Sequence, residues 1–351
     1  MNIVLSGIRS TGKLHLGNYY GALRNFIRMQ EENRCYFFIA DIHSLTTHPD
    51  PKMLHENVKN VLVDYLAAGI DPEKSVIYIQ SDLHETAELY LYLNMHVGIG
   101  ELMRTASFKD KARQQLHIDR MHTEEGDVER EIFNENNKNS VNAGLLTYPV
   151  LMAADILIHR ADKVPVGKDQ EQHLEMTRRF ARRFNNFYEV DYFKEPVAYN
   201  FGEELVKIPG LDGSGKMGKS EGNAIYLSDS PKEIEKKVKK ALTDAGPTEP
   251  NSVKPVYIEN LFTLLRVVST SEVVTHYEEQ WNSCAIRYGD LKKQLAEDII
   301  KVTTPIRERI LEIEKDDAYL RKVTLEGAER ARESARKTIE EVRRIVGLKP
   351  F

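Results

Sequence analysis

Short apolar runs alternate with longer helical patterns over the first 80 residues. Strands are expected at Ile3–Ser6, Cys35–Ala40 and Val76–Gln80, with helices at Gly17–Glu32 and Lys52–Ala68 between them. The three runs are apolar at nearly every position and end in small or acidic residues, which is typical of strands covered on both faces. This alternation predicts an α/β domain around a parallel sheet, with ligands at the carboxyl ends of the strands.

The pattern changes near residue 230, after which no strand-like run follows. Helical periodicity predicts further helices at Pro231–Leu242, Val256–Val268, Ser271–Asn282, Tyr288–Ile313 and Thr324–Val346. In the last one, small and apolar residues recur at steps of three and four from Ala328 to Ile345, so one narrow stripe should face a neighbour. We therefore divide the chain into residues 1–227 and an all-helical domain at 228–351, with packing of the last helix back on the first domain as one option.

One segment fits neither domain. Residues 112–140 are polar, acidic in the middle and rich in Asn, which is typical of a surface excursion or lid. His117 and His122 lie within it, but no cysteine or third ligand follows at a fixed spacing, so a solvated segment is the better interpretation than a metal site.

Composition narrows the class of protein. The 351 residues carry 49 Lys and Arg against 54 Asp and Glu, a net charge of −5, with two cysteines, Cys35 and Cys284. A chain of this length buries a full core without disulfides or metal, and few cysteines suit a reducing, cytoplasmic compartment. No apolar run reaches the ~18 residues of a membrane span. The charge gives no overall attraction for nucleic acid, so such binding would need a local basic surface.

The segment Gly213–Ser220, GSGKMGKS, matches the phosphate-binding pattern of P-loop NTPases. A P-loop needs a buried strand before it and a helix starting at its Lys-Ser pair. Here Pro209 interrupts the preceding run, and Gly222 and Asn223 disfavour a first helical turn. The P-loop NTPase is therefore kept only as an alternative from another class.

What remains is a glycine-rich loop with two cations, Lys216 and Lys219, and a further donor, Ser220. Two flexible ammonium groups suit a pyrophosphate that gains charge as the α–β bond of ATP breaks. Near the start, a strand is followed by a turn from Gly7 to Gly12 and by His15-Leu16-Gly17-Asn18 at a helix start. These donors at a positive helix end predict a nucleotide site without a P-loop.

The two motifs carry a resemblance to a known family. HLGN resembles the HIGH signature of class I aminoacyl-tRNA synthetases, and KMGKS resembles their KMSKS loop; they stand in the family's order around an α/β region. The stretch Ala143–Arg179 and the N-terminal SGIRSTGKLHLGNYYGAL resemble the bacterial tryptophanyl-tRNA synthetases, and the similarity runs through nearly the whole chain. Tyrosyl-tRNA synthetase is the nearest alternative, and a degenerate paralogue with a binding role is another, although the key motif residues are all present.

The resemblance implies a Rossmann-like catalytic domain, an anticodon-binding helical domain, and specific site residues. The catalytic residues that the resemblance implies are His15, Asn18, Lys216 and Lys219. Contacts to ATP are expected from Arg9, Ser10, Thr11, Gly17, Asn18, Gly167, Lys168, Asp169, Ile208, Lys216, Met217, Gly218, Lys219 and Ser220. Contacts to tryptophan are expected from Tyr148, Met152, Asp155, Val164, Val166 and Gln170.

Asp155 is the acceptor that the resemblance assigns to the indole N–H. A carboxylate could equally accept a phenol hydroxyl, so Asp155 alone does not exclude tyrosine. Its competing role is structural, as a helix residue that pairs with Arg160 or Arg179.

The resemblance also implies substrates and partners: L-tryptophan, ATP with Mg²⁺ as the substrate complex, tRNA(Trp) and a second copy of the chain in a homodimer, with no permanent metal or organic cofactor. Lysines in PKEIEKKVKKAL and four arginines, Arg178, Arg179, Arg182 and Arg183, are candidates for a tRNA surface. Two features depart from the family: Gly218 replaces the usual serine of the loop, and the 112–140 segment is longer than expected.

Overall fold

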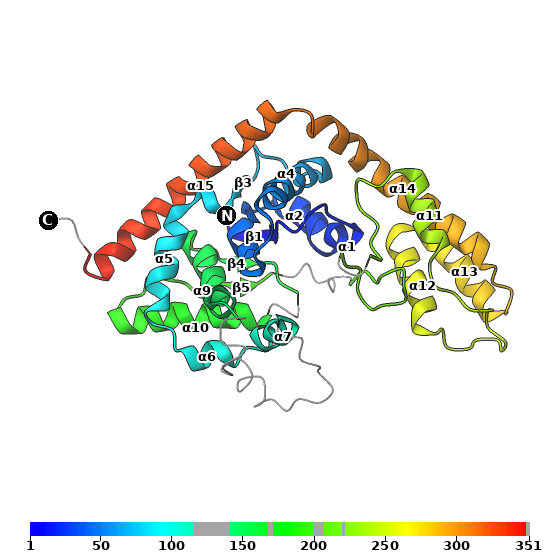
Figure 1. Cartoon of the computed structure of the whole chain (residues 1–351), viewed down its shortest axis with the longest axis horizontal. Coiled ribbons are helices and arrows are strands. Elements are labelled where there is room, and N and C mark those ends of the chain that lie inside the picture. Colours follow the sequence, from blue (N-terminus) through cyan, green and yellow to red (C-terminus); the bar gives the residue numbers. More distant parts are fainter. Residues whose placement is uncertain (116–140, 168–170, 200–206, 220–221, 349–351) are drawn as a thin grey trace.

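A computed structural model describes residues 1–115, 141–167, 171–199, 207–219 and 222–348 (Figure 1). Within them lies a five-stranded sheet in the order β3-β2-β1-β4-β5. Its strands are β1 (Ile3–Arg9), β2 (Arg34–Ala40), β3 (Val76–Ile79), β4 (Lys163–Val164) and β5 (Val197–Ala198). All these pairings are parallel. With β1 central and the chain crossing over between β3 and β4, the order is Rossmann-like and confirms the predicted fold class.

The strands bury both faces, as their continuous apolar pattern predicts. Along β2, Phe37 and Ile39 join one core while Tyr36 and Phe38 join the core on the opposite face, because successive side chains point to opposite sides. The strand β1 extends three residues beyond its expected end and includes Gly7. A Cβ at Gly7 would lie 2.7 Å from the ring of Phe38, its partner on β2, so this position of the ring depends on glycine.

Helices cover the two faces separately. The first face holds α1 (Leu16–Asn18), the π-helical turn η1 (Tyr19–Leu23), α2 (Arg24–Met29) and α4 (Pro51–Ala68). The second holds α5 (His84–Asn94), α9 (Ala143–Ile158) and α10 (Glu171–Tyr188). The bounds of α4 have local causes: the Asp50 side chain accepts the N–H groups of Lys52 and Met53, and Gly69 ends the helix at φ 116°.

Short elements connect these layers. They are α3 (Asp41–Ser44), η2 (Leu45–Thr47), η3 (Gln80–Asp82), α6 (Ile99–Met103) and α7 (Ala106–Gln115). The expected start of the polar excursion at residue 112 is wrong, because residues 112–115 complete α7 and Ala112 is buried against Phe108, Leu145 and Tyr148. Residues 116–140, including His117 and His122, lie outside the described part of the chain.

The helical region comprises α11 (Pro231–Lys239), α12 (Val256–Val268), α13 (Ser271–Asn282) and α14 (Tyr288–Ile313). The predicted bounds of the last three are confirmed to the residue. Trp281 is buried and donates its indole N–H to the Ser252 carbonyl at 2.8 Å. One apolar cluster includes Trp281, Met217 on the preceding loop and Phe37 of the sheet. The helical region therefore shares its core with one face of the sheet.

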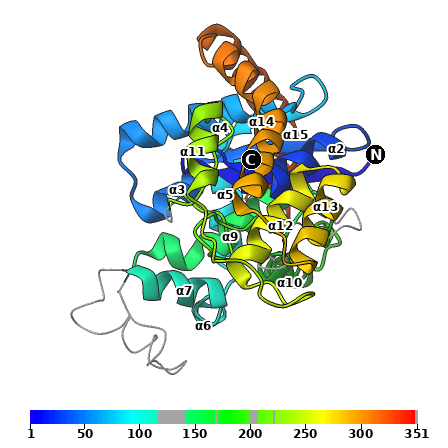
Figure 2. The same cartoon turned by 90° about the vertical axis from the view of Figure 1, so that its right-hand side faces the viewer.

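The last helix, α15 (Asp317–Ile345), meets α14 at the top of an arch and runs back over β3 and α5 (Figures 1 and 2). Its apolar stripe is buried as predicted, with Ala331 and Ala335 in the second core. The expected start at Thr324 is wrong: the Asp316 side chain accepts the Tyr319 N–H at 2.9 Å and begins the helix earlier. A Cβ on Gly327 would lie 1.7 Å from the Ile77 carbonyl oxygen, so the helix touches the strand backbone.

Both cysteines are free thiols, Cys35 buried and Cys284 part-buried. Across the described ranges, no helix combines the length and the apolar character needed to cross a bilayer.

Candidate active site

Backbone hydrogen bonds join the HLGN motif to the segment that follows KMGKS, about 200 residues later in the sequence. His15 and Tyr226 form an isolated antiparallel bridge. Leu16 donates its N–H to the Ile225 carbonyl at 3.0 Å, and Leu227 donates to the Leu14 carbonyl at 3.0 Å. The HLGN turn and the segment after KMGKS are thus held side by side at the carboxyl end of β1.

In the first motif, Gly12 turns the chain after β1 at φ 112°, and α1 begins at Leu16. The Asn18 side chain accepts the His15 N–H at 3.1 Å and fixes the turn. A Cβ on Gly17 would lie 2.8 Å from Cε1 of His15. The sequence predicted that an adenine or a backbone segment would come close to Gly17. In the structure it is the imidazole of His15 that packs against this glycine.

His15 is a buried, neutral imidazole. Burial, followed by the positive charges of Lys219 and Lys216, lowers the pKa of His15 to about 4. Its Nδ1 forms no hydrogen bond with any described residue. This nitrogen is enclosed beside Gly17, and the imidazole that carries it does not change charge near neutral pH.

Asn223 organises the loop that carries the two lysines. Its amide nitrogen donates to Asp212 Oδ1 at 2.9 Å and to Ser214 Oγ at 2.8 Å, while its oxygen accepts the Gly218 N–H at 2.9 Å. Gly210 makes room, since a Cβ there would lie 2.1 Å from the Asn223 nitrogen. The sequence marked Asn223 only as a poor helix residue and missed this role.

The loop is not a P-loop. Neither a strand before Gly213 nor a helix directly after Lys219 occurs in the described residues, and the next helix begins at Pro231. Instead, Met217 is buried in the core and donates its N–H to the Ile208 carbonyl at 2.8 Å. Anchored there, the loop leaves Lys216 exposed and directs Lys219 toward the first motif.

Lys219 docks on the glycine turn. Its Nζ lies 2.7 Å from the Gly12 carbonyl oxygen and 3.4 Å from Thr11 Oγ1. Burial lowers the pKa of Lys219 to about 8, and the negative charge of Asp64 opposes that shift. The ammonium therefore has a defined position before any phosphate is bound.

A second feature, a cavity of about 410 Å³, opens beside β1 and α9. Its volume is in the range of small-molecule sites. Among its lining residues are Gly7, Arg9, Phe38, His43, Thr46, Lys111, Tyr148, Met152, Asp155, Val164, Val166 and His173. Of the residues expected at the tryptophan site, all five within the described residues line this cavity. Arg9, expected at the nucleotide, lines it too.

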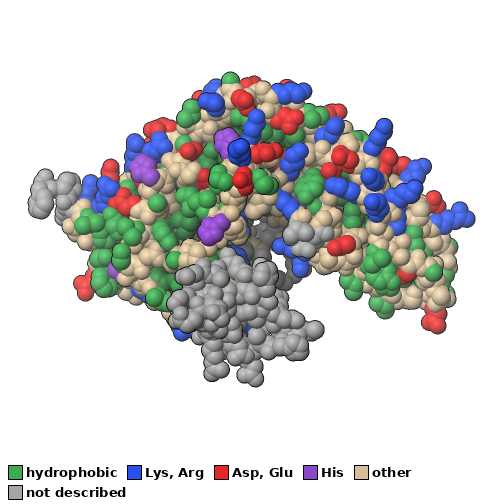
Figure 3. All heavy atoms as spheres, viewed as in Figure 1, with side chains coloured by type: hydrophobic (Ala, Val, Ile, Leu, Met, Phe, Trp, Pro, Cys, Tyr) green, Lys and Arg blue, Asp and Glu red, His purple; other side chains and the backbone are tan. Residues whose placement is uncertain are grey.

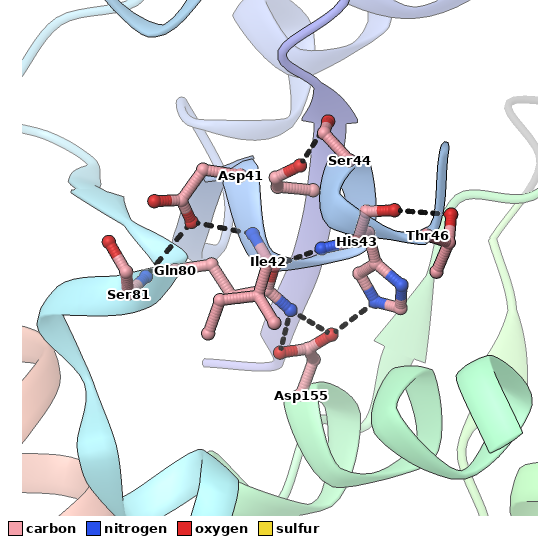
Figure 4. A network of polar contacts seen from close by, with 9 residues as sticks. Asp41, Ile42, His43, Ser44, Thr46, Gln80, Ser81 and Asp155 are labelled. Atoms are coloured by element: carbon pink, nitrogen blue, oxygen red, sulfur yellow. Dashed lines mark hydrogen bonds and ion pairs between the residues drawn. The ribbon is translucent and has the colours of Figure 1, made fainter. Parts of the chain in front are cut away.

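Asp155 lines this cavity and is buried on α9, and Figure 4 shows the polar side chains around it. Gln80 Nε2 donates to both carboxylate oxygens at 2.9 Å, and His43 Nε2 lies 2.9 Å from Oδ2. Burial raises the pKa of Asp155, opposed by the hydrogen bonds and charge of His43 and by Gln80. The expected structural alternative is wrong: Arg179 pairs with Glu101, and Arg160 stacks on the Tyr192 ring.

His43 and Gln80 were not anticipated from the sequence, although a signal existed. They lie just beyond the carboxyl ends of β2 and β3, where parallel sheets collect ligands. The His43 N–H also contacts Gln80 Oε1 at 3.2 Å, which links the two groups to each other.

Seven residues before Asp155 on α9, Tyr148 lines a cationic and aromatic part of the cavity. Tyr148 Oη and His173 Nε2 are 2.8 Å apart, and Lys111 Nζ lies 3.7 Å from the centre of the Tyr148 ring. Burial, followed by the charge of Arg9, lowers the pKa of Lys111 to about 8. The two cations near Tyr148, Lys111 and Arg9, make this part of the cavity suitable for the carboxylate of an amino acid or a phosphate.

The structure describes some of the other residues that were expected to bind ATP or tRNA. Ser10 donates to Ser44 Oγ at 3.0 Å, and Gly167 follows the cavity residue Val166. Lys168, Asp169, Gln170 and Ser220 lie outside the described residues. Each of the four arginines of α10 has an acidic partner: Arg178 and Arg182 pair with Glu175, and Arg179 and Arg183 pair with Glu101.

Comparison with known proteins identifies the family. The model of "tRNA synthetases class I (W and Y)" matches residues 1–304. This chain belongs to the class I tRNA synthetases of the tryptophan and tyrosine group. It is 62% identical to the tryptophan–tRNA ligase of Porphyromonas gingivalis, over 99% of this chain and 100% of that one. It is 41% identical to the enzyme of the same name from Thermotoga maritima, over 98% and 99% of the two chains.

Solved structures of this synthetase family have the same fold as this chain. Tryptophanyl-tRNA synthetase from Campylobacter jejuni, in complex with ADP and tryptophan, superposes with a TM-score of 0.81 at 31% identity, covering 98% of this chain and 99% of that one. A tyrosyl-tRNA synthetase from Archaeoglobus fulgidus, at 19% identity and a TM-score of 0.61, shares the fold.

Proposed function

We propose that this class I synthetase is a tryptophan–tRNA ligase, which activates L-tryptophan with ATP and transfers it to tRNA(Trp). The observation that carries the proposal is the cavity lined both by the buried acceptor Asp155 and by the cations Arg9 and Lys111, together with the bridged lysine loop. The two tryptophan–tRNA ligases described above, alike over their full length, support the choice of amino acid.

Asp155 selects the side chain by accepting the indole N–H. A buried donor without a partner costs roughly 1–3 kcal/mol, so an apolar slot with one acceptor favours indole over a plain hydrocarbon ring. Met152, Val164 and Val166 would contact the flat faces of the ring. Because Gln80 and His43 fix the carboxylate, its free lone pair would have one direction, which discriminates between indole and phenol geometry.

Activation requires placement and charge stabilisation. The tryptophan carboxylate attacks the α-phosphorus of Mg·ATP, the α–β bridging bond breaks, and tryptophanyl-adenylate and pyrophosphate form. Lys216 and Lys219 would stabilise the charge that grows on pyrophosphate, and the neutral His15 and Asn18 would hydrogen-bond the nucleotide. Further nucleotide contacts are proposed for Ser10, Thr11, Gly17, Gly167, Lys168, Asp169, Ile208, Met217, Gly218 and Ser220.

Transfer follows when the terminal ribose hydroxyl of the tRNA attacks the adenylate. Basic side chains gather on the shoulder formed by α11 and α14 (Figure 3), where Lys232, Lys236, Lys239 and Lys240 are exposed. This supports a tRNA-binding role for residues 228–351, which we propose as the anticodon-binding domain. The arginines of α10 are weaker candidates because each has a carboxylate partner.

A homodimer and a cytoplasmic location complete the proposal. Leu91, Met95, Ile99 and Phe187 are each more than half exposed at the joined ends of α5, α6 and α10. A grouped apolar surface of this kind marks a protein interface and supports pairing with a second copy.

ATP–pyrophosphate exchange tests the proposal directly. Labelled pyrophosphate should enter ATP when tryptophan is present and not when tyrosine replaces it, and tRNA(Trp) should then accept tryptophan. Exchange with tyrosine alone would identify a tyrosyl enzyme, and no exchange with either amino acid would contradict the proposal.

A further inference from the structure

A buried carboxylate with no role in the proposed mechanism lies beneath the lysine loop. Asp64 is in the middle of α4 and is 2% exposed, between apolar neighbours such as Val63 and Tyr65 that belong to the first core. An isolated carboxylate in such surroundings is costly unless partners compensate it. Its partners therefore indicate why it is there.

The first partner is the HLGN turn. Leu14 donates its backbone N–H to Asp64 Oδ2 at 2.7 Å, across 50 residues of chain. Leu14 stands between the glycine that turns the chain, Gly12, and the buried imidazole of His15. Asp64 thus holds the turn from the side of α4.

The second partner is the positive charge of Lys219. Burial raises the pKa of Asp64 to about 7, while the Leu14 N–H and the charges of Lys219 and then Lys13 lower it. In return, Asp64 is the group that raises the pKa of Lys219 against the effect of burial. The electrostatic interaction is therefore mutual, although Lys219 makes its hydrogen bonds to Gly12 and Thr11.

The turn is consequently held from two sides. Asp64 accepts a hydrogen bond from the N–H of Leu14, and Lys219 donates one to the carbonyl of Gly12, two residues earlier. Lys216, on the same loop, is exposed, whereas Lys219 is held at the turn by these contacts.

We propose that Asp64 is a positioning residue for Lys219: it fixes the Gly12–Leu14 turn through the Leu14 N–H, and its charge holds the Lys219 ammonium at the Gly12 carbonyl, where a phosphate group then meets it. The proposal rests on the proposed function. Asp64 touches neither substrate nor phosphate, and its effect passes through Lys219.

A double-mutant cycle tests this coupling. Asp64→Asn keeps an oxygen for the Leu14 N–H and removes the charge, and Lys219→Met removes the ammonium. In exchange assays, Asp64→Asn should lower kcat by about tenfold with an unchanged KM for tryptophan, and it should have no further effect in the Lys219→Met background. Equal losses in both backgrounds, or no loss in either, would overturn the proposal.

Binding of inorganic pyrophosphate, measured by calorimetry, gives a readout that needs no amino acid. Asp64→Asn should weaken pyrophosphate binding by about tenfold, as it lowers kcat, and only where Lys219 is present. Tighter binding in Asp64→Asn would show that the carboxylate merely repels the anion and would overturn the proposal. Because this cycle works even if tryptophan supports no exchange, failure of the proposed function is distinguishable from failure of the coupling.

Two controls separate positioning from folding. Glu85→Gln removes a carboxylate that is 3% exposed on α5, on the other face of the sheet, and should leave both readouts unchanged. Thermal unfolding of Asp64→Asn should be cooperative, since the amide retains the hydrogen bond to Leu14. A loss of exchange in Glu85→Gln as large as that in Asp64→Asn would assign the effect to buried carboxylates in general and contradict the coupling.

Discussion

The imidazole of His43 and the carboxylate of Asp155 lie 2.9 Å apart, from Nε2 to Oδ2, although 112 residues separate them in the chain. Gln80 completes the arrangement from a third element, so that the acceptor proposed for indole is oriented by side chains from the ends of two neighbouring strands. The orientation of Asp155 therefore depends on His43, which lines the cavity, and on Gln80, which is not among the lining residues.

Replacement of Gln80 should weaken tryptophan binding without affecting ATP. Gln80→Met keeps the volume but leaves Asp155 without two of its hydrogen bonds, so KM for tryptophan should rise about tenfold while KM for ATP is unchanged. Gln30 is a matched control, because it is also a buried glutamine with hydrogen bonds to the backbone near Gly69 and Asp71. Gln30→Met should lower the melting temperature and leave both KM values alone; a parallel rise in KM for tryptophan would refute the assignment.

Gly17 should tolerate no side chain. In Gly17→Ala, the new methyl group would meet the His15 ring at 2.8 Å and displace it, and a shift of about 1 Å at a reacting site is expected to lower kcat by at least tenfold. Gly21→Ala, four residues later, meets nothing within 4 Å and should retain full exchange activity. Equal activities of the two variants would show that the position of His15 is unimportant.

Stability should depend on the contact between α15 and β3. Gly327→Ala would force a Cβ to within 1.7 Å of the Ile77 carbonyl oxygen, so the helix must move away, at a cost of about 3 kcal/mol in the free energy of unfolding. Gly289→Ala on α14 has open space and a better helix former, and should be neutral or stabilising by up to about 1 kcal/mol. Urea unfolding of both variants measures the difference; a Gly327→Ala protein as stable as the parent would contradict the packing.

Acid should destabilise the protein partly through His159. This side chain is 1% exposed, stacks on Tyr36 at 4.2 Å between ring centres and lies 3.0 Å from Tyr78 Oη; burial, followed by the charge of Arg34, lowers its pKa to about 3. The unfolded chain therefore binds this proton below about pH 6.5 while the folded protein does not. The contribution is complete above pH 6.5 and is lost as the pH falls toward 3, by up to about 1.4 kcal/mol per pH unit.

His159→Phe keeps the stack on Tyr36 and removes the titration. The slope of the unfolding free energy against pH, measured by urea unfolding between pH 6.5 and 4.5, should fall by up to about one proton. An identical slope in the parent and in His159→Phe would mean that His159 is charged in the folded state.

Periodicity revealed most of the fold because its causes are local. Strands β1, β2 and β3 are buried on both faces and therefore read as unbroken apolar runs, and α12 to α14 each carry their own apolar stripe. The strands β4 and β5 went unpredicted, because two residues each carry no period and their pairing depends on neighbours such as Val4 opposite Lys163. The same holds for α6 and α7, whose short apolar faces acquire meaning only against α9.

The site residues also fall into those that a local sequence pattern predicts and those that depend on the tertiary fold. The motifs HLGN and KMGKS are visible as residue types at fixed spacings, but their contact depends on the bridge between His15 and Tyr226, which no local pattern announces. Asp155 was expected from resemblance, whereas Gln80 and Asp64 act through hydrogen bonds to distant segments. Long-range polar contacts of this kind are invisible until the topology is known.

The packing of α15 also sets an order of events during synthesis. Two hundred and fifty residues separate Ile77 from Gly327, which lies directly against it. At a translation rate of roughly 5–20 residues per second, about 10 to 50 s pass between the synthesis of β3 and that of the part of α15 that packs against it. Until then, the places of Ala331, Ala335, Ile339 and Val342 in the second core are vacant, and the apolar surface of β3 and α5 is open to water or to a chaperone. The second core is therefore complete only after α15 has left the ribosome.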